Sequence, residues 1–545
     1  MAWKTWRWPL ILLNLWMITL TGIHSIPLES HEVLVIETSR EMESQGEWIL
    51  PSFNYEPRLN KPPFSYWAVT MLSHLDPTSK DVQIWHGRLI SLLAGLVMVF
   101  ATYHAGKTLF NPFIGKLASL LLLSMQGYIS FSHHARPDFL YSTFCALQLF
   151  AWTYAWKAED GTARQRLYGW LGWAMAGLAT LTKGPQVPAV FLAGVLVFLL
   201  QSPERKRTLR ILRPFAGIAI WCLLVLPWWV LLQQHLNEIR IALSETQISG
   251  SLLHNIASWQ EILSFYYPLN LFSLMIPASL VIPFMIPWIW KALKEASPPM
   301  SMLLYASTTF LVLFTLGGHY RKHYLLPLLP TFSIVLAHGI QAAAFPQLQG
   351  NRRRGMMVLV ALGTILCLGL ITWGKGYPSL LWIFLNSIPL WLLLRRELQD
   401  SSWDQTLFST QLMKTSVVLI ILVTTCLTYF PFGQNQWRRS EQSFAESIGT
   451  TLQAGDLVVQ WKSDSYMIPF YAKRPVPQVE DEGRLATYFQ ENQGTHRVYA
   501  ILPKLELASF SSRFENVVLS SAESRRHPEK ELVFVKLVAL KNMQP

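Results

Sequence analysis

Residues 112–132 contain the run Leu117-Ala118-Ser119-Leu120-Leu121-Leu122-Leu123-Ser124, and the segment carries one charged side chain, Lys116. A helix needs about 20 predominantly apolar residues to cross a hydrocarbon core about 30 Å thick. This segment has that length, and similar segments recur along the chain of 545 residues. The sequence therefore predicts an α-helical polytopic membrane protein.

Successive apolar windows predict about 13 transmembrane helices. Their approximate ranges are 8–26, 86–105, 112–132, 138–156, 168–182, 186–201, 214–233, 264–290, 301–317, 323–344, 355–373, 377–394 and 415–432. The short pair at 168–201 is divided by Lys183-Gly184-Pro185, which ends one helix and starts another. The first run is interpreted as a retained helix, because no small-residue cleavage site follows Ile23.

Basic residues concentrate in alternate inter-span segments, most densely at Arg205-Lys206-Arg207 and Arg352-Arg353-Arg354. This positive-inside pattern predicts a multi-pass protein of the cytoplasmic (inner) membrane with a cytoplasmic N-terminus. The loop at 27–85 and the segment 433–545 then lie on the periplasmic side, in contact with membrane lipid or solvent. The net charge of +12 is explained by topology, so we expect no nucleic-acid partner.

Composition excludes several other classes of protein. With 51% hydrophobic, 13% aromatic and 14% charged residues, the chain is neither disordered nor collagen-like. All four cysteines lie inside apolar runs, which argues against a disulfide scaffold and a cysteine zinc site.

The composition changes after residue 432. Short β-rich runs at 456–461, 497–502, 515–519 and 531–537 alternate there with polar helical stretches near 438–453 and 482–492. We therefore predict a transmembrane catalytic domain at 1–432 and a small extracytoplasmic α/β domain at 433–545.

The first outer loop, 27–85, is too apolar and too patterned for a linker. Val33, Ile36 and Arg40 suit an amphipathic helix on the membrane surface. For Glu37, Arg40 and Glu41, a solvated supporting role and a functional role both remain open.

Several motifs carry a resemblance to a known family. They are His31-Glu32, Arg40-Glu41-Met42, Gly46-x-Trp48-x-x-Pro51, Asn60-Lys61-Pro62-Pro63-x-x-Tyr66-Trp67, Ala135-Arg136-Pro137-Asp138, Leu181-Thr182-Lys183-Gly184-Pro185, Pro227-Trp228-Trp229 and the segment from Arg321 to Pro330. In order and spacing the chain resembles the family 39 membrane glycosyltransferases, which include protein O-mannosyltransferases and 4-amino-4-deoxy-L-arabinose transferases of lipid A. The resemblance implies a GT-C fold and a polyprenyl-phosphate-linked sugar donor. It also implies inverting transfer to a lipid, glycan or protein acceptor on the outer face of the membrane.

The resemblance places the catalytic carboxylates at Asp138 and in the pair His31-Glu32, where His31 stands in place of the usual Asp. A hydroxyl acceptor needs a general base, so Asp138, Glu32 and His31 are all candidates. An acceptor phosphate requires little deprotonation. For Asp138 the structural alternative is a helix N-cap after Pro137, paired with Arg136.

A departing lipid phosphate gains negative charge and requires fixed cations. Lys61, Arg58, Arg321 and Lys322 fall at the outer boundary and are the candidates, although snorkelling beside aromatic residues would place them there too. Lys183 is either a further phosphate contact or part of a turn. Tyr66, His323 and Glu245 are candidates for acceptor or substrate contact. The resemblance also raises a divalent metal ion, but the Glu expected before Lys61 is Asn60 here, so the metal remains open.

Two other function classes also remain open. A polyprenyl-linked sugar flippase or other transporter would have as many spans, but more charges within the spans. A sensor or assembly protein would explain the C-terminal segment but not the crowded first loop.

Overall fold

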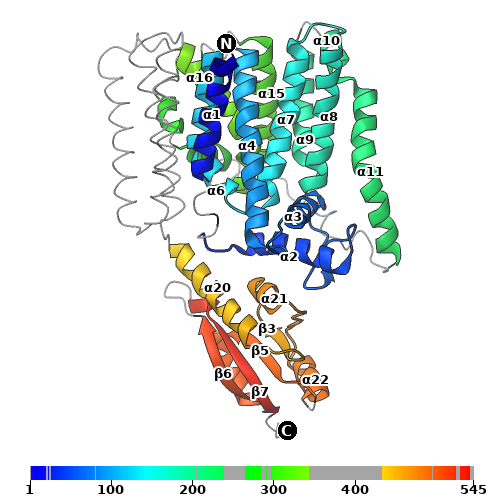
Figure 1. Cartoon of the computed structure of the whole chain (residues 1–545), viewed down its shortest axis with the longest axis vertical. Coiled ribbons are helices and arrows are strands. Elements are labelled where there is room, and N and C mark those ends of the chain that lie inside the picture. The colour runs from blue at the N-terminus through cyan, green and yellow to red at the C-terminus, as the bar shows by residue number, and fades with distance from the viewer. Residues whose placement is uncertain are drawn as a thin grey trace, which may run out of the picture. The chain divides into compact units, whose positions relative to one another are not determined.

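The structure is a computed structural model of the chain (Figure 1). It describes residues 2–19, 23, 26–79, 81–202, 205–238, 264–276, 278–283, 286, 290, 296–318, 320–342, 433–493, 495–522 and 528–540. The predicted spans at 355–373, 377–394 and 415–432 lie outside the described residues.

The chain forms two compact units. The helical unit comprises residues 1–25, 48–50 and 59–430, and the sheet unit comprises residues 26–47, 51–58 and 431–545. Part of the first outer loop therefore belongs with the C-terminal segment. The boundary predicted at residue 432 does not include these loop residues in the C-terminal domain.

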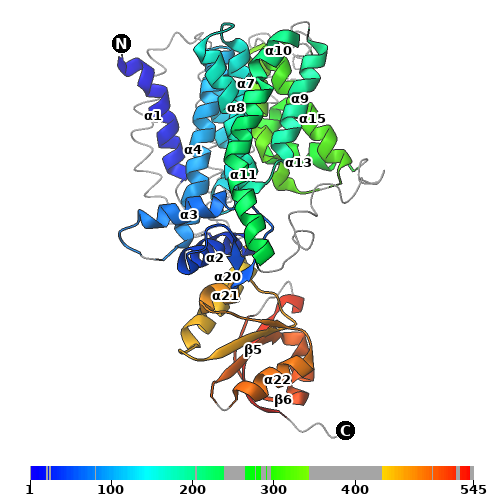
Figure 2. The same ribbon diagram turned by 90° about the vertical axis from the view of Figure 1, so that its right-hand side faces the viewer.

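The helical unit consists of long helices that run side by side (Figures 1 and 2). Its described elements are α1 (Ala2–Thr19), α3 (Phe64–His74), α4 (Ile84–Leu109), α5 (Pro112–Ser124), α6 (Gln126–Ser132), α7 (Pro137–Lys157), α8 (Ala163–Lys183), α9 (Gln186–Gln201), α10 (Arg205–Leu212), α11 (Pro214–Glu238), α13 (Tyr266–Leu274), η3 (Ala278–Val281), α15 (Pro298–Leu316), η4 (Lys322–Leu328) and α16 (Leu329–Ala342). Helix α7 packs against α4 and α8, and α9 packs against α15. The centre of this unit is a core of apolar side chains contributed by nearly all of these helices.

Among the described residues, four helices are long and apolar enough to cross a membrane, or five if the bent pair α5–α6 is one span. Several helices begin and end close to the ranges predicted from the sequence, including α7, α9 and the break between α8 and α9. The single span predicted at 264–290 is wrong in its described part, because α13 ends at Leu274 and a 3-10 turn follows at Ala278–Val281. The total of about 13 crossings stays a prediction.

The predicted span at 112–132 is broken in its middle. Helices α5 and α6 meet at an angle of 61°. Met125 has extended backbone angles there, and the Gln126 N–H donates to the carbonyl of Ile276 at 2.8 Å. Because a buried backbone donor must find a partner, this bond compensates for the interrupted helix.

Helices α4 and α5 approach each other closely at two glycines. A Cβ atom added to Gly106 would lie 2.7 Å from the Cα of Gly115. Small residues permit such contact between helices in a membrane, where packing rather than the hydrophobic effect holds them together.

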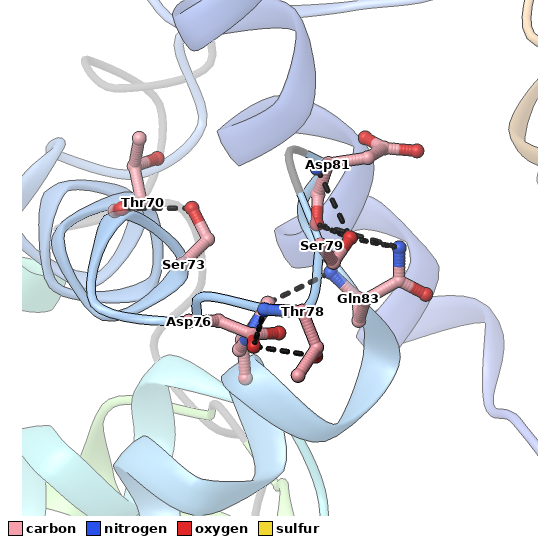
Figure 3. Close-up of polar contacts among 8 residues, drawn as sticks. Thr70, Ser73, Asp76, Thr78, Ser79, Asp81 and Gln83 are labelled. Carbon is pink, nitrogen blue, oxygen red and sulfur yellow. Dashed lines mark hydrogen bonds and ion pairs between the residues drawn. The ribbon is translucent and has the colours of Figure 1, made fainter.

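The connection between α3 and α4 is fixed by its own polar side chains (Figure 3). Asp76 accepts hydrogen bonds from the backbone and the hydroxyl of Thr78, which hold the pKa of Asp76 below its ordinary value. Its other oxygen lies 3.2 Å from Nε2 of the buried His86 in the first turn of α4. Nδ1 of His86 accepts from the Gln83 N–H, so Nε2 is the atom that donates to Asp76. These contacts orient α4 as it enters the bundle.

The sheet unit contains a mixed sheet of five strands in the order β4-β3-β5-β7-β6. Its elements are α2 (Ser30–Gln45), β1 (Ser52–Phe53), β2 (Glu56–Pro57), α20 (Gly433–Thr451), β3 (Leu457–Trp461), α21 (Met467–Ala472), β4 (Gln478–Val479), α22 (Glu482–Asn492), β5 (Val498–Pro503), η6 (Lys504–Glu506), α23 (Leu507–Arg513), β6 (Phe514–Ala522), η7 (Pro528–Lys530) and β7 (Leu532–Leu540). Strand β3 is parallel to β4 and β5, whereas β7 is antiparallel to β5 and β6. The four β-rich runs seen in the sequence correspond to β3, β5, β6 and β7, and the short β4 was not predicted.

Helix α2 of the first outer loop packs into this unit. Its Arg40 guanidinium lies 4.4 Å from the centre of the Phe470 ring and donates to the Phe470 carbonyl at 3.2 Å. Glu41 accepts from the Ser52 hydroxyl and from the N–H groups of Asn54 and Tyr55. Burial raises the pKa of Glu41, and these donors oppose the shift. The interpretation of solvated charges along this helix is therefore wrong for Glu41, which is 2% exposed.

Asn54 joins the β1–β2 hairpin to the segment before β4. Its Nδ2 donates to the Val476 carbonyl at 2.9 Å, and the Val476 N–H donates to its Oδ1 at 2.7 Å. We expect Asn54→Ala to leave both Val476 groups without a partner, at a cost of about 2 kcal/mol. Amide hydrogen exchange at Val476 should then rise about 30-fold.

Tyr55→Ala is the matched control for this change. Both residues have positive φ, 59° for Asn54 and 64° for Tyr55, but the Tyr55 side chain is 46% exposed. Equal exchange at Val476 in the two variants would show that backbone strain, and not the side-chain clamp, explains the effect.

Candidate active site

A cavity of about 910 Å³ opens among the helices of the helical unit. Most of its wall is apolar and comes from α9, α11 and α15, including Val190, Trp221, Val225, Trp228 and Leu313. Its polar lining includes Asn60 and Lys61 before α3, and Lys183 at the end of α8 with Gly184 after it. The cavity therefore combines a long apolar wall with two cationic side chains.

The break between α8 and α9 places Lys183 at the cavity. Gly184 has φ of 118°, a backbone conformation that disfavours other residues, and Pro185 follows. The hydroxyl of Tyr141 on α7 donates to the Gly184 carbonyl at 3.1 Å and accepts from the Val187 N–H at 3.0 Å. Tyr141 thus satisfies backbone groups on both sides of the break.

Asp138 in the first turn of α7 lies at the centre of a charged cluster. The side chain is 6% exposed; one oxygen pairs with Lys183, and the other lies 3.0 Å from Nε of Arg136. Nε2 of His323 in η4 lies 3.6 Å from the carboxylate. The Lys183 ammonium also lies 4.5 Å from the centre of the Tyr324 ring, a cation–π distance.

The two ion pairs of Asp138 determine which chemical role suits its carboxylate. A carboxylate at the start of a membrane helix is costly unless it meets a cation, and here it meets two. Such a carboxylate accepts a proton poorly, because protonation would leave Lys183 and Arg136 without their counter-charge. It is suited to hold both cations in place, and one of them, Lys183, lines the cavity.

The four predicted phosphate-binding cations are distributed over both units. Lys61 lines the cavity. Arg321 is exposed and Lys322 is half-buried at the start of η4, close in sequence to the His323 of the Asp138 cluster. Arg58 belongs to the sheet unit, where its N–H donates to the Pro51 carbonyl at 2.7 Å.

The remaining candidates have different surroundings. Glu32 is 0% exposed, and its Oε2 accepts from the Glu29 N–H in a capping box at the start of α2. Its neighbour His31 is exposed, and both belong to the sheet unit. Tyr66 is fully buried on α3, where it contributes to helix packing. Glu245 lies outside the described residues.

The described residues do not fit a divalent metal ion. No group of three or more His, Cys, Asp or Glu side chains gathers in the part of the chain that the structure describes. Near the cavity, Asp138 and His323 lie close together, but the Asp138 carboxylate is already neutralised by Lys183 and Arg136. Metal binding prefers ligands that carry negative charge without competing cations.

Known proteins share both the sequence around this cavity and the fold of the chain. Residues 60–231, which include Lys61, Asp138 and Lys183, match the family described as dolichyl-phosphate-mannose-protein mannosyltransferase. The crystal structure of ArnT from Cupriavidus metallidurans bound to undecaprenyl phosphate superimposes with a TM-score of 0.70 over 97% of both chains, at 16% sequence identity. The chain has the fold of ArnT. The apo ArnT structure from the same organism gives a TM-score of 0.71 over 98% of both chains.

Relatives found by sequence are more similar to this chain, but over shorter segments. A protein of Aquifex aeolicus is 26% identical over 343 residues, which cover 62% of this chain and 63% of that protein. An undecaprenyl phosphate-alpha-4-amino-4-deoxy-L-arabinose arabinosyl transferase of Yersinia pestis is 28% identical over 205 residues, 37% of this chain and 36% of the relative. The alignments thus span less than two thirds of the length of these relatives. The resemblance to GT-C glycosyltransferases that the motifs predicted is confirmed.

Sequence reasoning did not assign roles to two tyrosines beside this cluster. Tyr141 follows Asp138 by three residues on α7, and Tyr324 follows His323 directly. The signal for Tyr324 was present, since it stands in the motif from Arg321 to Pro330. Nothing in the sequence marked Tyr141, because its bonds reach residues more than 40 positions away.

Proposed function

We propose that the protein is a membrane glycosyltransferase that moves a sugar from a polyprenyl-phosphate donor to a lipid, glycan or protein acceptor. The observation that supports it most is the cavity of about 910 Å³, with apolar walls and with Lys61 and Lys183 in its lining. An isoprenoid phosphate has the same division into an apolar chain and an anionic head. The ArnT structure with undecaprenyl phosphate and the arabinosyl transferase relatives support the same class of donor.

In this proposal the isoprenoid chain lies along Trp221, Val225 and Leu313, and its phosphate faces Lys61 and Lys183. Trp221 is held toward Thr180 by a hydrogen bond of 3.0 Å from its Nε1, which fixes part of the wall. Charge-assisted hydrogen bonds from ammonium groups to phosphate oxygens are roughly twice as strong as neutral ones. The two lysines therefore set the position of the donor head.

The reaction breaks the bond between the anomeric carbon and the phosphate oxygen, and forms a bond from that carbon to an acceptor oxygen. The bonding electrons leave with the polyprenyl phosphate, whose growing charge Lys61 and Lys183 stabilise. Attack from the side opposite the leaving group inverts the anomeric carbon, as the family resemblance implies.

Asp138 serves in this account as a positioning residue. It holds Lys183 and Arg136 so that their charge faces the donor head without rearrangement. Preorganised charge of this kind costs no reorganisation at the moment of reaction. A hydroxyl acceptor must in addition lose its proton to a base, while an acceptor phosphate needs no such transfer.

The remaining topology is also part of the proposal. The basic loops, such as the one at Arg205-Lys206-Arg207, favour a cytoplasmic N-terminus in the inner membrane. With about 13 crossings, residues 433–545 then form an α/β domain on the periplasmic side, and transfer takes place on that face.

Native mass spectrometry of the purified protein tests the donor site. Polyprenyl phosphate should bind, and polyprenol of equal chain length should bind at least ten times more weakly, because it lacks the charge. If polyprenyl phosphate and polyprenol bound equally well, the assignment of the cavity to a lipid phosphate would be contradicted.

A further inference from the structure

The sheet unit holds a second cavity, of about 490 Å³. It is lined by Asn54, Glu56, Gly455, Asp456, Leu457, Lys473, Arg474, Pro475, Pro477, Tyr488 and His496. Most of these residues precede or begin β3, β4 and β5, which are parallel, so that part of the cavity lies at the amino ends of three neighbouring strands. Tyr488 comes instead from α22. The β1–β2 hairpin of the first outer loop supplies the side with Asn54 and Glu56.

Arg474 is held rigidly at this cavity. Its Nη1 donates to the carbonyls of Gln453 and Asp456 at 3.0 and 2.7 Å, and its Nε donates to the Ala472 carbonyl at 3.3 Å. Its Nη2 donates to no described residue. A guanidinium that is fixed on one side and open on the other is a preorganised donor for an anion.

Two further polar groups converge there. Neither the His496 imidazole nor the Tyr488 hydroxyl has a hydrogen-bond partner among the described residues, and both line the cavity. Burial raises the pKa of Tyr488, so its hydroxyl is a neutral donor at physiological pH. The acidic Asp456 is already paired with Arg497 at 2.7 Å, which leaves its charge compensated.

We propose that this cavity binds a phosphorylated saccharide, with the phosphate on Arg474, Lys473 and His496 and the sugar ring against Tyr488. The volume exceeds what a phosphate alone fills, and it lies within the range of roughly 300–1,000 Å³ typical of small-molecule sites. Tyrosine offers an apolar face and a polar tip, which suits a sugar ring. Glu56 at the rim supplies an acceptor for sugar hydroxyls.

That this saccharide is part of the transferase acceptor rests on the proposed function. That the cavity binds a phosphorylated saccharide does not depend on it. Isothermal titration of the full-length protein with N-acetylglucosamine 1-phosphate therefore measures the site without any transfer. We expect inorganic phosphate and N-acetylglucosamine each to bind at least ten times more weakly than the phosphosugar, because each fills half of the site.

Variants connect the binding to this cavity. His496→Ala and Tyr488→Phe should each weaken phosphosugar binding about ten-fold, since each removes one hydrogen bond to a charged or polar ligand group. Lys473→Asn, which keeps a residue suited to its φ of 51°, should act in the same direction. Lys530→Ala, at an exposed cation of η7 outside the cavity, and Lys61→Ala, in the helical unit, should leave it unchanged.

Each outcome decides the proposal. Loss of binding in the cavity variants with the two controls intact supports it, even if the protein transfers no sugar. No measurable phosphosugar binding, equal binding of inorganic phosphate, or loss through Lys61→Ala instead would overturn it.

Discussion

Asp138→Asn is expected to reduce sugar transfer by at least two decades and to destabilise the helical unit by about 3–5 kcal/mol. The amide keeps the size of the side chain but removes its charge. Lys183 and Arg136 would then repel each other around a site that is 6% exposed in the native protein. Thermal unfolding in detergent and a transfer assay at saturating donor measure the two effects.

A second substitution separates folding from function. Lys183→Met removes the cation, whose ammonium lies over the Tyr324 ring, and keeps an unbranched apolar side chain. We expect the double variant Asp138→Asn/Lys183→Met to regain most of the stability lost in Asp138→Asn, because the buried charges are then closer to balance. Transfer should stay lost, since the cation beside the donor head is absent.

Full sugar transfer by Asp138→Asn would contradict the role of Asp138 in positioning Lys183 and Arg136. Strict additivity of the two stability changes would also count against it, since groups in direct contact should couple by more than about 0.5 kcal/mol. A large loss of transfer with unchanged donor affinity and unchanged stability would instead return Asp138 to the role of general base.

Lys61→Ala is expected to weaken polyprenyl-phosphate binding by one to two decades. The change removes a charge-assisted contact worth roughly 1.5–3 kcal/mol. Lys61→Arg should restore only part of the affinity, because the planar guanidinium presents its donors in a different geometry. The effect should appear in binding of the phosphate form and should be absent for polyprenol.

Lys107→Ala provides the matched control for Lys61. Lys107 lies in the last turn of α4 and does not line the cavity. Unaltered affinity in the Lys107 variant shows that loss of one positive charge is not sufficient. If both variants weakened binding equally, general attraction between a basic protein and an anionic lipid would be the better explanation.

Local features of the site could be predicted from the sequence. The Lys183-Gly184-Pro185 break follows from backbone chemistry, since Gly184 takes a positive φ and Pro185 cannot continue the helix. The pairing of Asp138 with Arg136 could also be predicted, because the two residues are only two positions apart in the sequence. Apolar runs also predicted the positions of several described helices, such as α7 and α9.

Contacts between distant segments could not be predicted in this way. Lys183 meets Asp138 across 45 positions, and Arg40 meets Phe470 across 430. Periodicity shows that α2 has a polar face, but it does not show that this face packs on a segment more than 400 residues away. The capping role of Glu32 is a local feature: its carboxylate accepts from the Glu29 N–H three residues before it.

The most direct measurement follows the fate of the donor. Purified protein in lipid nanodiscs is incubated with a polyprenyl-phosphate sugar and candidate acceptors, and both products are quantified by mass spectrometry. The account predicts free polyprenyl phosphate and glycosylated acceptor in equal amounts, at a rate reduced by Lys61→Ala and by Asp138→Asn. Movement of the intact donor across the membrane in proteoliposomes, with no cleavage of the sugar–phosphate bond under any acceptor, would contradict it and identify a flippase.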